Sequence, residues 1–336
     1  MKIGVVGDVH WSKYSSIVRS RGNKYSTRLE NCIKSINWAE EVTKHCDLIV
    51  YLGDFFDKSD LSAEELSALN DLIWNDVPHK FLVGNHEMGL NDLSFSSSHT
   101  FNLHDNFEVI DEPTYLEQNN ICFIPYILES DRKPFSKYIE NKDSIVFSHN
   151  DIKGITMGKF VSNIGFDINE INENCKLFIN GHIHNGEIIN DKIINLGNLT
   201  GQNFSENAVE YRHKICILND DDIEYIENPH AFNFMKFDLT CVDVSIDWLE
   251  NIINMYGGSN PVVIYKIYQE QKSKIDDFIN KKNITSRIII EPRKQNERLI
   301  ELPSLSINHL DEFNKYILDE LGNDEIVLEE LSVITN

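Results

Sequence analysis

Hydrophobic residues near the start of the chain form two alternating patterns. Segments 2–7, 47–54 and 79–87 contain continuous apolar runs, which are typical of strands buried on both faces of a parallel sheet. Apolar residues recur at helical spacing over 29–45, between the first and second segments. Between the second and third segments, the sequence from Ser62 to Glu65 has the form of a helix capping box. The order strand, helix, strand, helix, strand predicts βαβ units and an α/β fold.

The apolar runs shorten after about residue 105 and indicate further strands. We expect a hairpin turn at Asn190-Asp191, helical insertions near 130–141 and 166–174, and a hairpin within 205–240 whose acidic turn is 220–222.

The pattern changes character after about residue 240. Residues 261–293 have the pattern strand, helix, strand, and the apolar residues at 307–321 recur at helical steps that Gly322 stops. We therefore predict three regions: an α/β domain over 1–240, a small α+β domain over 241–300, and a C-terminal helical region over 301–336.

Composition narrows the possible functions. Hydrophobic residues make up 41% of the 336 residues, which is enough for a sizeable core, and the net charge is −23. An acidic chain is repelled by nucleic acid unless basic residues gather locally or metal ions lie between. Six cysteines without close spacing are typical of reduced thiols. We expect a cytoplasmic protein with no signal peptide and no membrane association.

Polar motifs follow the ends of several predicted strands. Because the carboxyl ends of strands in an open α/β sheet are where ligands bind, we expect these motifs to converge. They are Asp8-Val9-His10, Gly53-Asp54-Phe55-Phe56-Asp57, Gly84-Asn85-His86-Glu87, Ser148-His149 and Gly181-His182-Ile183-His184.

The residue types in these motifs suit a centre for two divalent cations. Two neighbouring cations need one shared anionic ligand, and Asp54 is suited to bridge them. One ion would take Asp8, His10 and one histidine of the pair at 182 and 184. The other ion would take Asn85, His149 and the remaining histidine. A set of oxygen and imidazole ligands without thiolate suits Mn²⁺, Fe²⁺ or Zn²⁺.

The motif series D-x-H, G-D-x-x-D, G-N-H-E, S-H, G-H-x-H resembles that of the calcineurin-like metallophosphoesterases. The resemblance implies a two-sheet α/β sandwich with two divalent ions at the strand ends. It implies Asp8, His10, Asp54 and His184 around one ion, and Asp54, Asn85, His149 and His182 around the other. His86 would stand beside the scissile phosphate without binding metal, where it stabilises the transition state or protonates the leaving oxygen.

Three further stretches resemble the SbcD-type nuclease subunits of double-strand-break repair complexes, in their phage and bacterial form. They are "GDVHW" with the basic loop after it, "GDFFD", and "NLGNLTGQNFSE" at 195–206. The motif "GDFFDKSD" lacks the arginine that serine/threonine phosphatases carry there. In contrast, "GNHE" matches those phosphatases, whereas the nucleases more often have "GNHD". The resemblance leaves the role of Asp57 undefined.

The SbcD resemblance implies a Mn²⁺-dependent DNA exonuclease or endonuclease that acts in DNA repair, recombination or replication. Its partners would be DNA, an SbcC-type coiled-coil ATPase that the helix at 307–321 contacts, and in some cases a second copy of the chain. The resemblance implies that residues 1–240 are the nuclease domain, that 241–300 are a capping and DNA-binding domain, and that 301–336 contain the helix that docks on the ATPase. A phage-encoded protein would work in the host cytoplasm. The alternatives are a metallophosphatase or cyclic-nucleotide phosphodiesterase of the same superfamily, and a metal-binding scaffold that organises the ATPase.

A basic loop with aromatic residues follows the first motif. Such a loop beside metal ions can hold a DNA strand by phosphate contacts and base stacking, although a solvated loop is the alternative interpretation. The candidate DNA-binding residues are Lys13, Arg19, Arg21, Lys24 and Arg28.

Overall fold

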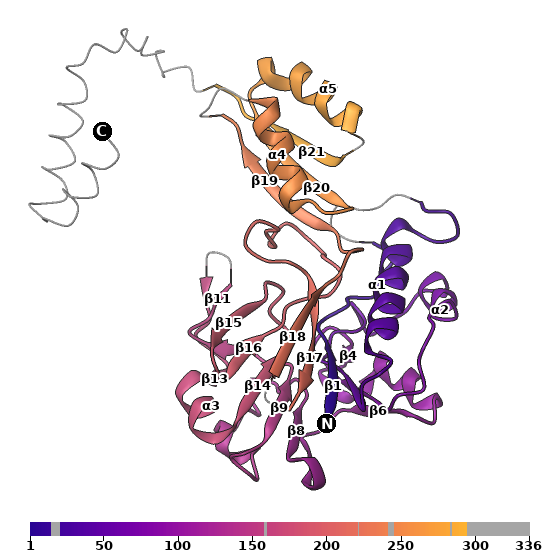
Figure 1. Cartoon of the computed structure of the whole chain (residues 1–336), viewed down its shortest axis with the longest axis vertical. Helices are drawn as coiled ribbons and strands as arrows, with labels where there is room; N and C mark the ends of the chain where they lie inside the picture. The colour runs from indigo at the N-terminus through magenta and orange to yellow at the C-terminus, as the bar shows by residue number, and fades with distance from the viewer. Residues whose placement is uncertain (15–20, 158–159, 221, 241–244, 283, 294–336) are drawn as a thin grey trace, which may run out of the picture. The chain divides into compact units, whose positions relative to one another are not determined.

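The computed structural model describes residues 1–336 except 15–20, 158–159, 221, 241–244, 283 and 294–336 (Figure 1). Met1–Ile290 form one compact unit. The helix predicted at 307–321 and the rest of the predicted C-terminal region over 301–336 lie outside the described residues.

The first of two large sheets has the strand order β18-β17-β1-β2-β3-β6. Four parallel strands form its centre and one edge: β1 (Lys2–Val6), β2 (Leu48–Tyr51), β3 (His79–Leu82) and β6 (Phe107–Ile110). The hairpin of β17 (Lys214–Asn219) and β18 (Asp222–Glu227) adds to β1 in the antiparallel sense (Figure 1). The predicted hairpin with its acidic turn is thereby confirmed.

The second large sheet has the order β15-β16-β14-β9-β8-β7. Its inner strands run parallel to one another and its two edge strands run antiparallel to their neighbours. The strands are β7 (Thr114–Leu116), β8 (Ile121–Ile124), β9 (Ile145–Ser148), β14 (Leu177–Asn180), β15 (Glu187–Asn190) and β16 (Ile193–Asn195). The hairpin predicted at Asn190-Asp191 connects β15 to β16 and is confirmed.

The two large sheets pack face to face through a shared apolar core. Ile3 and Val50 of the first sheet lie in one buried cluster with Phe123, Phe147 and Ile179 of the second. Helices α1 (Thr27–Thr43) and α2 (Ala63–Leu69) cover the outer face of the first sheet, and α3 (Ile168–Asn174) covers that of the second. The predicted two-sheet α/β sandwich is confirmed.

Local sequence signals explain where these helices begin. Ser26 caps α1 by accepting a hydrogen bond from the backbone N–H of Leu29 at 3.2 Å. Ser62 and Glu65 form the predicted capping box at the start of α2. The helical insertion expected near 130–141 is wrong, since only a 3₁₀ turn at Phe135–Lys137 forms there. Pro134 immediately precedes that turn, and proline disfavours a helical backbone at the residue before it.

Short strands supplement the two sheets. β4 (Met88–Gly89) and β5 (Asp92–Ser96) form a hairpin directly after the third polar motif. Two further pairs lie between β9 and α3: β10 (Ile152–Lys153) with β13 (Phe166–Asp167), and β11 (Thr156–Met157) with β12 (Phe160–Val161).

A third, smaller sheet has a core of its own. Its parallel strands are β19 (Asn233–Asp238), β20 (Pro261–Ile267) and β21 (Thr285–Ile290), with helices α4 (Ile246–Tyr256) and α5 (Lys272–Lys282) between them in the chain. The strand, helix, strand pattern predicted over 261–293 is confirmed, whereas α4 was not predicted. β19 belongs to this sheet although it precedes residue 241, and the predicted domain boundaries stay predictions.

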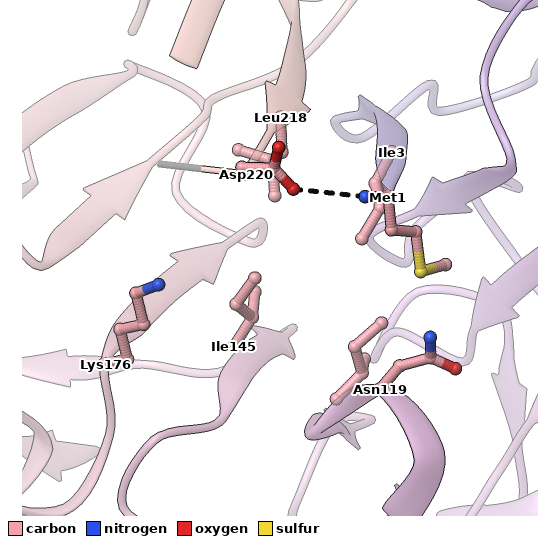
Figure 2. A pocket seen from close by; sticks show the side chains of 8 residues that line it. Met1, Ile3, Asn119, Ile145, Lys176, Leu218 and Asp220 are labelled. Carbon is pink, nitrogen blue, oxygen red and sulfur yellow. Dashed lines mark hydrogen bonds and ion pairs between the residues drawn. The ribbon is translucent and has the colours of Figure 1, made fainter. Parts of the chain in front are cut away.

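A cavity of about 270 Å³ lies at one edge of the two large sheets, by the strand ends opposite those that carry the polar motifs (Figure 2). Ile3, Ile121, Ile145 and Leu218 line it, and the N-terminal ammonium lies 3.2 Å from the Asp220 carboxylate beside it. This position separates the cavity from the chemistry of the motif residues.

Cys32, Cys46, Cys122, Cys175 and Cys216 are free and buried, and burial raises the pKa of the Cys122 thiol to about 12. Among the described residues, no helix combines the length and apolar character that a membrane crossing requires.

Candidate metal centre

The polar motifs converge at the carboxyl ends of the two large sheets. Asp8 and His10 follow β1, Asp54 follows β2, Asn85 and His86 follow β3, His149 follows β9, and His182 and His184 follow β14. Their possible ligand atoms form three groups, each with all its atoms within 4.8 Å of one another. The groups are Asp8, His10 and His184; His10, Asp54 and His86; and Asp54, His149 and His182.

Asp54 lies between the two halves of this cluster. One half contains Asp8, His10 and His184, and the other contains Asn85, His149 and His182. Its Oδ2 is 3.1 Å from Nε2 of His149 and 3.9 Å from Nε2 of His10. Asn85 belongs to the second half, since its Oδ1 lies 3.3 Å from Nε2 of His149 and 3.0 Å from Nδ1 of His182. Asp54 is thus close to ligand candidates of both halves, and its bridging role stays a prediction.

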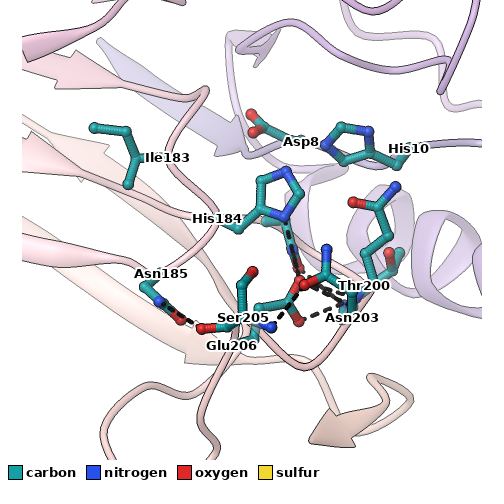
Figure 3. A network of polar contacts seen from close by, with 12 residues as sticks. Asp8, His10, Ile183, His184, Asn185, Thr200, Asn203, Ser205 and Glu206 are labelled. Atoms are coloured by element: carbon teal, nitrogen blue, oxygen red, sulfur yellow. Dashed lines mark hydrogen bonds and ion pairs between the residues drawn. The ribbon is translucent and has the colours of Figure 1, made fainter. Parts of the chain in front are cut away.

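Two histidines of one half have carboxylates behind them. Nδ1 of His10 donates to Oδ1 of Asp57 at 3.1 Å, and Nδ1 of His184 is 3.3 Å from Oε1 of Glu206. A histidine that donates from one ring nitrogen presents the lone pair of the other nitrogen to a cation. Nε2 of both rings is thereby directed into the cluster, as Figure 3 shows for His184 between Asp8 and Glu206.

The histidines of the other half are held in a related way. Nδ1 of His149 donates to the backbone carbonyl of Leu52 at 2.9 Å, and Nε2 of His182 donates to Oδ1 of Asp151 at 3.2 Å. His182 therefore turns Nδ1 toward the cluster, whereas His149 turns Nε2 toward it. Asp151 and Glu206 were missed by the sequence reasoning, although Asp151 lies only two residues after His149.

Three of the predicted ligands have a backbone conformation that side chains rarely adopt. The φ angles of His10, Asp54 and His182 are 50°, 46° and 74°. Left-handed backbone at residues other than glycine costs about 1–3 kcal/mol each and concentrates at functional sites. The strain identifies these positions as places where the direction of the side chain outweighs local stability.

Glycine is required at two positions because the chain passes directly behind a carboxylate. A Cβ at Gly84 would lie 2.1 Å from Oδ1 of Asp54, and a Cβ at Gly181 would lie 2.5 Å from Oδ1 of Asp8. Both distances are far below van der Waals contact, so any side chain at these glycines would displace a predicted ligand.

Glu87 joins two of the motif loops. Its carboxylate accepts hydrogen bonds from the backbone N–H groups of Gly84 and Phe56, both at 2.8 Å. Burial, followed by the charge of Asp54, raises the pKa of Glu87 to about 8. The glutamate of "GNHE" thus holds the loops of Asp54 and His86 together from behind.

Charge at the centre is crowded and buried. Burial raises the pKa of Asp54, but the neighbouring histidines, His149 foremost and then His10 and His86, together lower it more, so the net shift is downward. For His149, burial lowers the pKa and the Asp54 carboxylate raises it, with a net rise to about 9. The buried carboxylates are stabilised by nearby positive charge. Without bound cations, the protonated imidazole of His149 supplies that charge.

His86 lies on the accessible side of the cluster. Its side chain is 40% exposed, whereas those of Asp54 and His149 are 1% and 0% exposed. Its ring packs edge-on against His10 with centroids 4.7 Å apart, and Nδ1 donates to the backbone carbonyl of Asp57 at 3.2 Å. This leaves Nε2 on the side from which a substrate would approach.

Among the candidate DNA-binding residues, Arg28 differs from the expectation. Its side chain is fully buried and donates to the carbonyl oxygens of Gly201 at 2.7 Å, Val9 at 3.0 Å and His10 at 3.2 Å. The guanidinium is not available to a DNA strand. Its role is structural, because it fixes the backbone that carries His10.

The other candidates are partly or largely exposed, except Arg19, which lies outside the described residues. Nη1 of Arg21 is 3.3 Å from Oε1 of Glu64, and Nζ of Lys24 is 2.7 Å from Oδ2 of Asp71. Both side chains therefore pair with carboxylates in or near α2. Lys13 lies over the ring of Tyr14. None of these residues belongs to the three ligand groups, and their predicted role stays a prediction.

The donor set fits divalent cations. Oδ2 of Asp8 and Nε2 of His10 are buried without a hydrogen-bond partner among the described residues, and both belong to the cluster. Such groups are costly to bury unless something pairs with them, and carboxylate, amide oxygen and imidazole suit cations such as Mn²⁺ or Zn²⁺. Divalent cations held by these residues would supply activation of water and neutralisation of charge on a phosphoryl group.

No curated protein matches the chain. The family model "Calcineurin-like phosphoesterase" matches residues 1–226, which include every residue of the cluster. The chain therefore belongs to the calcineurin-like phosphoesterase family, whose members hydrolyse phosphoesters with the help of divalent metal ions.

Proposed function

We propose that this protein is a Mn²⁺-dependent DNA nuclease that hydrolyses phosphodiester bonds at DNA ends. It would act with an SbcC-type coiled-coil ATPase in DNA repair, recombination or replication, as the SbcD resemblance implies. The observation that carries the proposal is the environment of Lys58, which stands where phosphatases of the family have their phosphate-binding arginine.

Lys58 is committed to another partner. Its Nζ lies 3.2 Å from Oε2 of Glu65, a buried carboxylate that also accepts from the backbone N–H groups of Ser62 at 2.7 Å and Lys13 at 3.0 Å. A phosphate monoester carries an additional negative charge, which a bidentate arginine neutralises. With the lysine held by the cap of α2, the centre suits a diester better than a monoester.

His86 supports the same proposal. Cleavage of a phosphodiester releases a sugar oxygen, which is a poor leaving group unless it is protonated. An accessible imidazole beside Asp54 can donate that proton, and general acid catalysis of this kind contributes about 10²–10⁴-fold. The backbone N–H of His86 donates to Oδ1 of Asp54 at 2.9 Å, which fixes the histidine beside the centre.

Local basic and aromatic side chains support DNA as the substrate. Lys13 and Tyr14 follow His10 closely in the chain, and the Tyr14 side chain is 51% exposed. Lys13 offers a phosphate contact and Tyr14 a surface for base stacking. The ion pairs of Arg21 and Lys24 are exposed, and exposed pairs of this kind contribute little to stability. Phosphate oxygens can replace their carboxylate partners.

The substrate is tested with the purified protein and Mn²⁺. We expect degradation of duplex or single-stranded DNA, little hydrolysis of p-nitrophenyl phosphate, and a loss of DNA cleavage in His86→Ala. If the protein hydrolyses p-nitrophenyl phosphate or a cyclic nucleotide briskly and leaves DNA intact, the phosphatase or phosphodiesterase alternative replaces the nuclease.

The partner requires a separate experiment. A nuclease that acts with an ATPase depends on both His86 and residues 305–336, whereas a scaffold that only organises the ATPase depends on 305–336 alone. We expect His86→Ala to abolish the biological activity of the complex while leaving binding to an SbcC-type ATPase intact. Full biological activity in His86→Ala would support the scaffold alternative.

A further inference from the structure

We infer that Glu206 and Gln202 are positioning residues for one half of the metal centre, the half that contains His10 and His184. Both belong to a segment, residues 198–206, that contributes no ligand of its own. The inference rests on the proposed two-cation centre but not on DNA as the substrate.

The segment is hydrogen-bonded to the motif loops that follow β1 and β14. The backbone N–H of Leu199 donates to the carbonyl of Asp8 at 2.7 Å, and the hydroxyl of Thr200 donates to the carbonyl of Val9 at 3.0 Å. The N–H of Asn198 donates to the carbonyl of His184 at 3.0 Å. The segment therefore spans the two loops that supply ligands to this half.

Glu206 is the carboxylate that holds His184. It is 2% exposed, and its Oε1 lies 3.3 Å from Nδ1 of His184. Oε1 also accepts from the side-chain amide of Asn198 at 2.7 Å and from the backbone N–H of Gln202 at 3.0 Å. These donors fix the carboxylate in one orientation, so that His184 keeps its proton on Nδ1 and directs Nε2 toward Asp8 and His10 (Figure 3).

Gln202 acts on His10 through Asp57. Its side-chain amide donates to Oδ1 of Asp57 at 2.6 Å, and the same oxygen accepts from Nδ1 of His10 at 3.1 Å. The chain Gln202, Asp57, His10 thus parallels the chain Asn198, Glu206, His184. One segment sets the orientation of both histidines, and this gives Asp57 the role that sequence motifs left undefined.

The other half of the centre is independent of this segment. His149 is held by the carbonyl of Leu52, and His182 is held by Asp151. The loop of Asp151 is held by Asn150 and Asn180, because the backbone N–H of Asn150 donates to Oδ1 of Asn180 at 3.1 Å. A change at Glu206 should consequently weaken one cation site and leave the other unchanged.

The test is a titration of the metal-free full chain with Mn²⁺, without DNA, followed by calorimetry and by electron paramagnetic resonance. We expect two bound ions and a coupled two-manganese signal for the unmodified protein. Glu206→Gln keeps the shape of the side chain but places an amide among hydrogen-bond donors. It should weaken one site by roughly tenfold or more and leave the signal of a single manganese at one equivalent.

Control variants identify which site is lost. Asp151→Asn is the matched change behind the other half and should weaken the second site instead, whereas Glu210→Gln, an exposed change nearby, should weaken neither. The double variant Glu206→Gln with His184→Ala should lose no site beyond the one that Glu206→Gln weakens. The double variant Glu206→Gln with His182→Ala should be impaired at both cation sites. Gln202→Ala should weaken the same site as Glu206→Gln, by a smaller factor.

Three outcomes would overturn the inference: unchanged affinity at both sites in Glu206→Gln, equal weakening of both sites, or a single bound ion in the unmodified protein. Melting temperatures of the metal-free variants separate these outcomes from unfolding, since a structural role alone lowers the melting temperature without selecting a site. Because the titration contains no DNA, failure of the nuclease proposal would leave its result intact.

Discussion

Two buried polar clusters of this protein contain the same residue types but have different roles. One is the candidate metal centre. The other surrounds Glu40 of α1 and His79 of β3. Both nitrogens of His79 have acceptors, Val77 O at 2.6 Å and the Glu40 carboxylate at 3.1 Å. In contrast, Nε2 of His10 has no hydrogen-bond partner in the part of the chain that the structure describes, although the ring is equally buried.

The Glu40 cluster is complete without a ligand. Its carboxylate also accepts from the hydroxyl of Tyr51 at 2.6 Å and from the backbone N–H of Asn75 at 3.2 Å. Buried polar groups in folded proteins almost always have partners, so the complete cluster contributes stability, whereas the incomplete one indicates a ligand. Burial and residue type are alike in the two clusters, and satisfaction of the hydrogen-bonding atoms separates them.

The largest difference should come from Asp54→Asn. The amide can still accept from the N–H of His86 but lacks the charge shared by both halves, so we expect kcat/KM for phosphoester hydrolysis to fall by roughly 10³-fold. Steady-state kinetics with Mn²⁺ measures the fall, and urea unfolding of the metal-free protein measures how much of its stability depends on the Asp54–His149 pair. A loss of stability with activity retained would place Asp54 with the structural cluster.

Glu40→Ala is the converse change. It leaves His79 and the Tyr51 hydroxyl without their carboxylate, and breaking a buried pair costs about 3–5 kcal/mol. Urea unfolding should show that loss in the free energy of unfolding, while kcat/KM below the new melting temperature stays near the parent value. Lost hydrolysis at full stability would contradict the comparison.

Added Mn²⁺ should stabilise the protein through the incomplete cluster alone. At about 100 times the dissociation constant, one bound ion adds about 2.7 kcal/mol to the free energy of unfolding. Thermal unfolding should register the gain in Glu40→Ala and in the parent, and EDTA should remove it. If Asp54→Asn showed the full gain, the cations would bind somewhere else.

Tyr51→Phe should have the smallest effect. Burial, followed by the charge of Glu40, raises the pKa of Tyr51 well above its ordinary value. Losing a hydrogen bond to a carboxylate costs about 1.5–3 kcal/mol, and we expect the low end of that range because His79 still pairs with Glu40.

The pH dependence of this variant follows from the sign of the pKa shift. Above about pH 10 the unfolded tyrosine loses its proton while the folded one keeps it, so the parent loses stability as the pH rises. Phenylalanine has no such loss, and the unfolding free energies of the two proteins should therefore converge in alkaline solution. Parallel curves between pH 8 and 11, measured by urea unfolding, would contradict the predicted shift.

Much of the fold and the motif positions could be predicted because their signals are local. Continuous apolar runs gave β1, β2 and β3, and Ser62 with Glu65 gave the start of α2. Helix α4 was missed although Ile246, Leu249 and Ile253 have helical spacing. Arg28 was assigned to DNA because composition reports charge and not direction, and only packing shows that its guanidinium points inward.

The sequence by itself determined the α/β class, the motif order and the family, because strand patterns and ligand types depend on neighbours along the chain. The tertiary structure alone decided which partner stands behind each histidine. Glu206 lies 22 positions after His184 and Asp57 lies 47 after His10, and folding brings each within hydrogen-bond distance. Hydrogen bonds act over about 3 Å in space, whatever the separation in sequence. The orientation of the ligands was therefore decided by packing between distant segments.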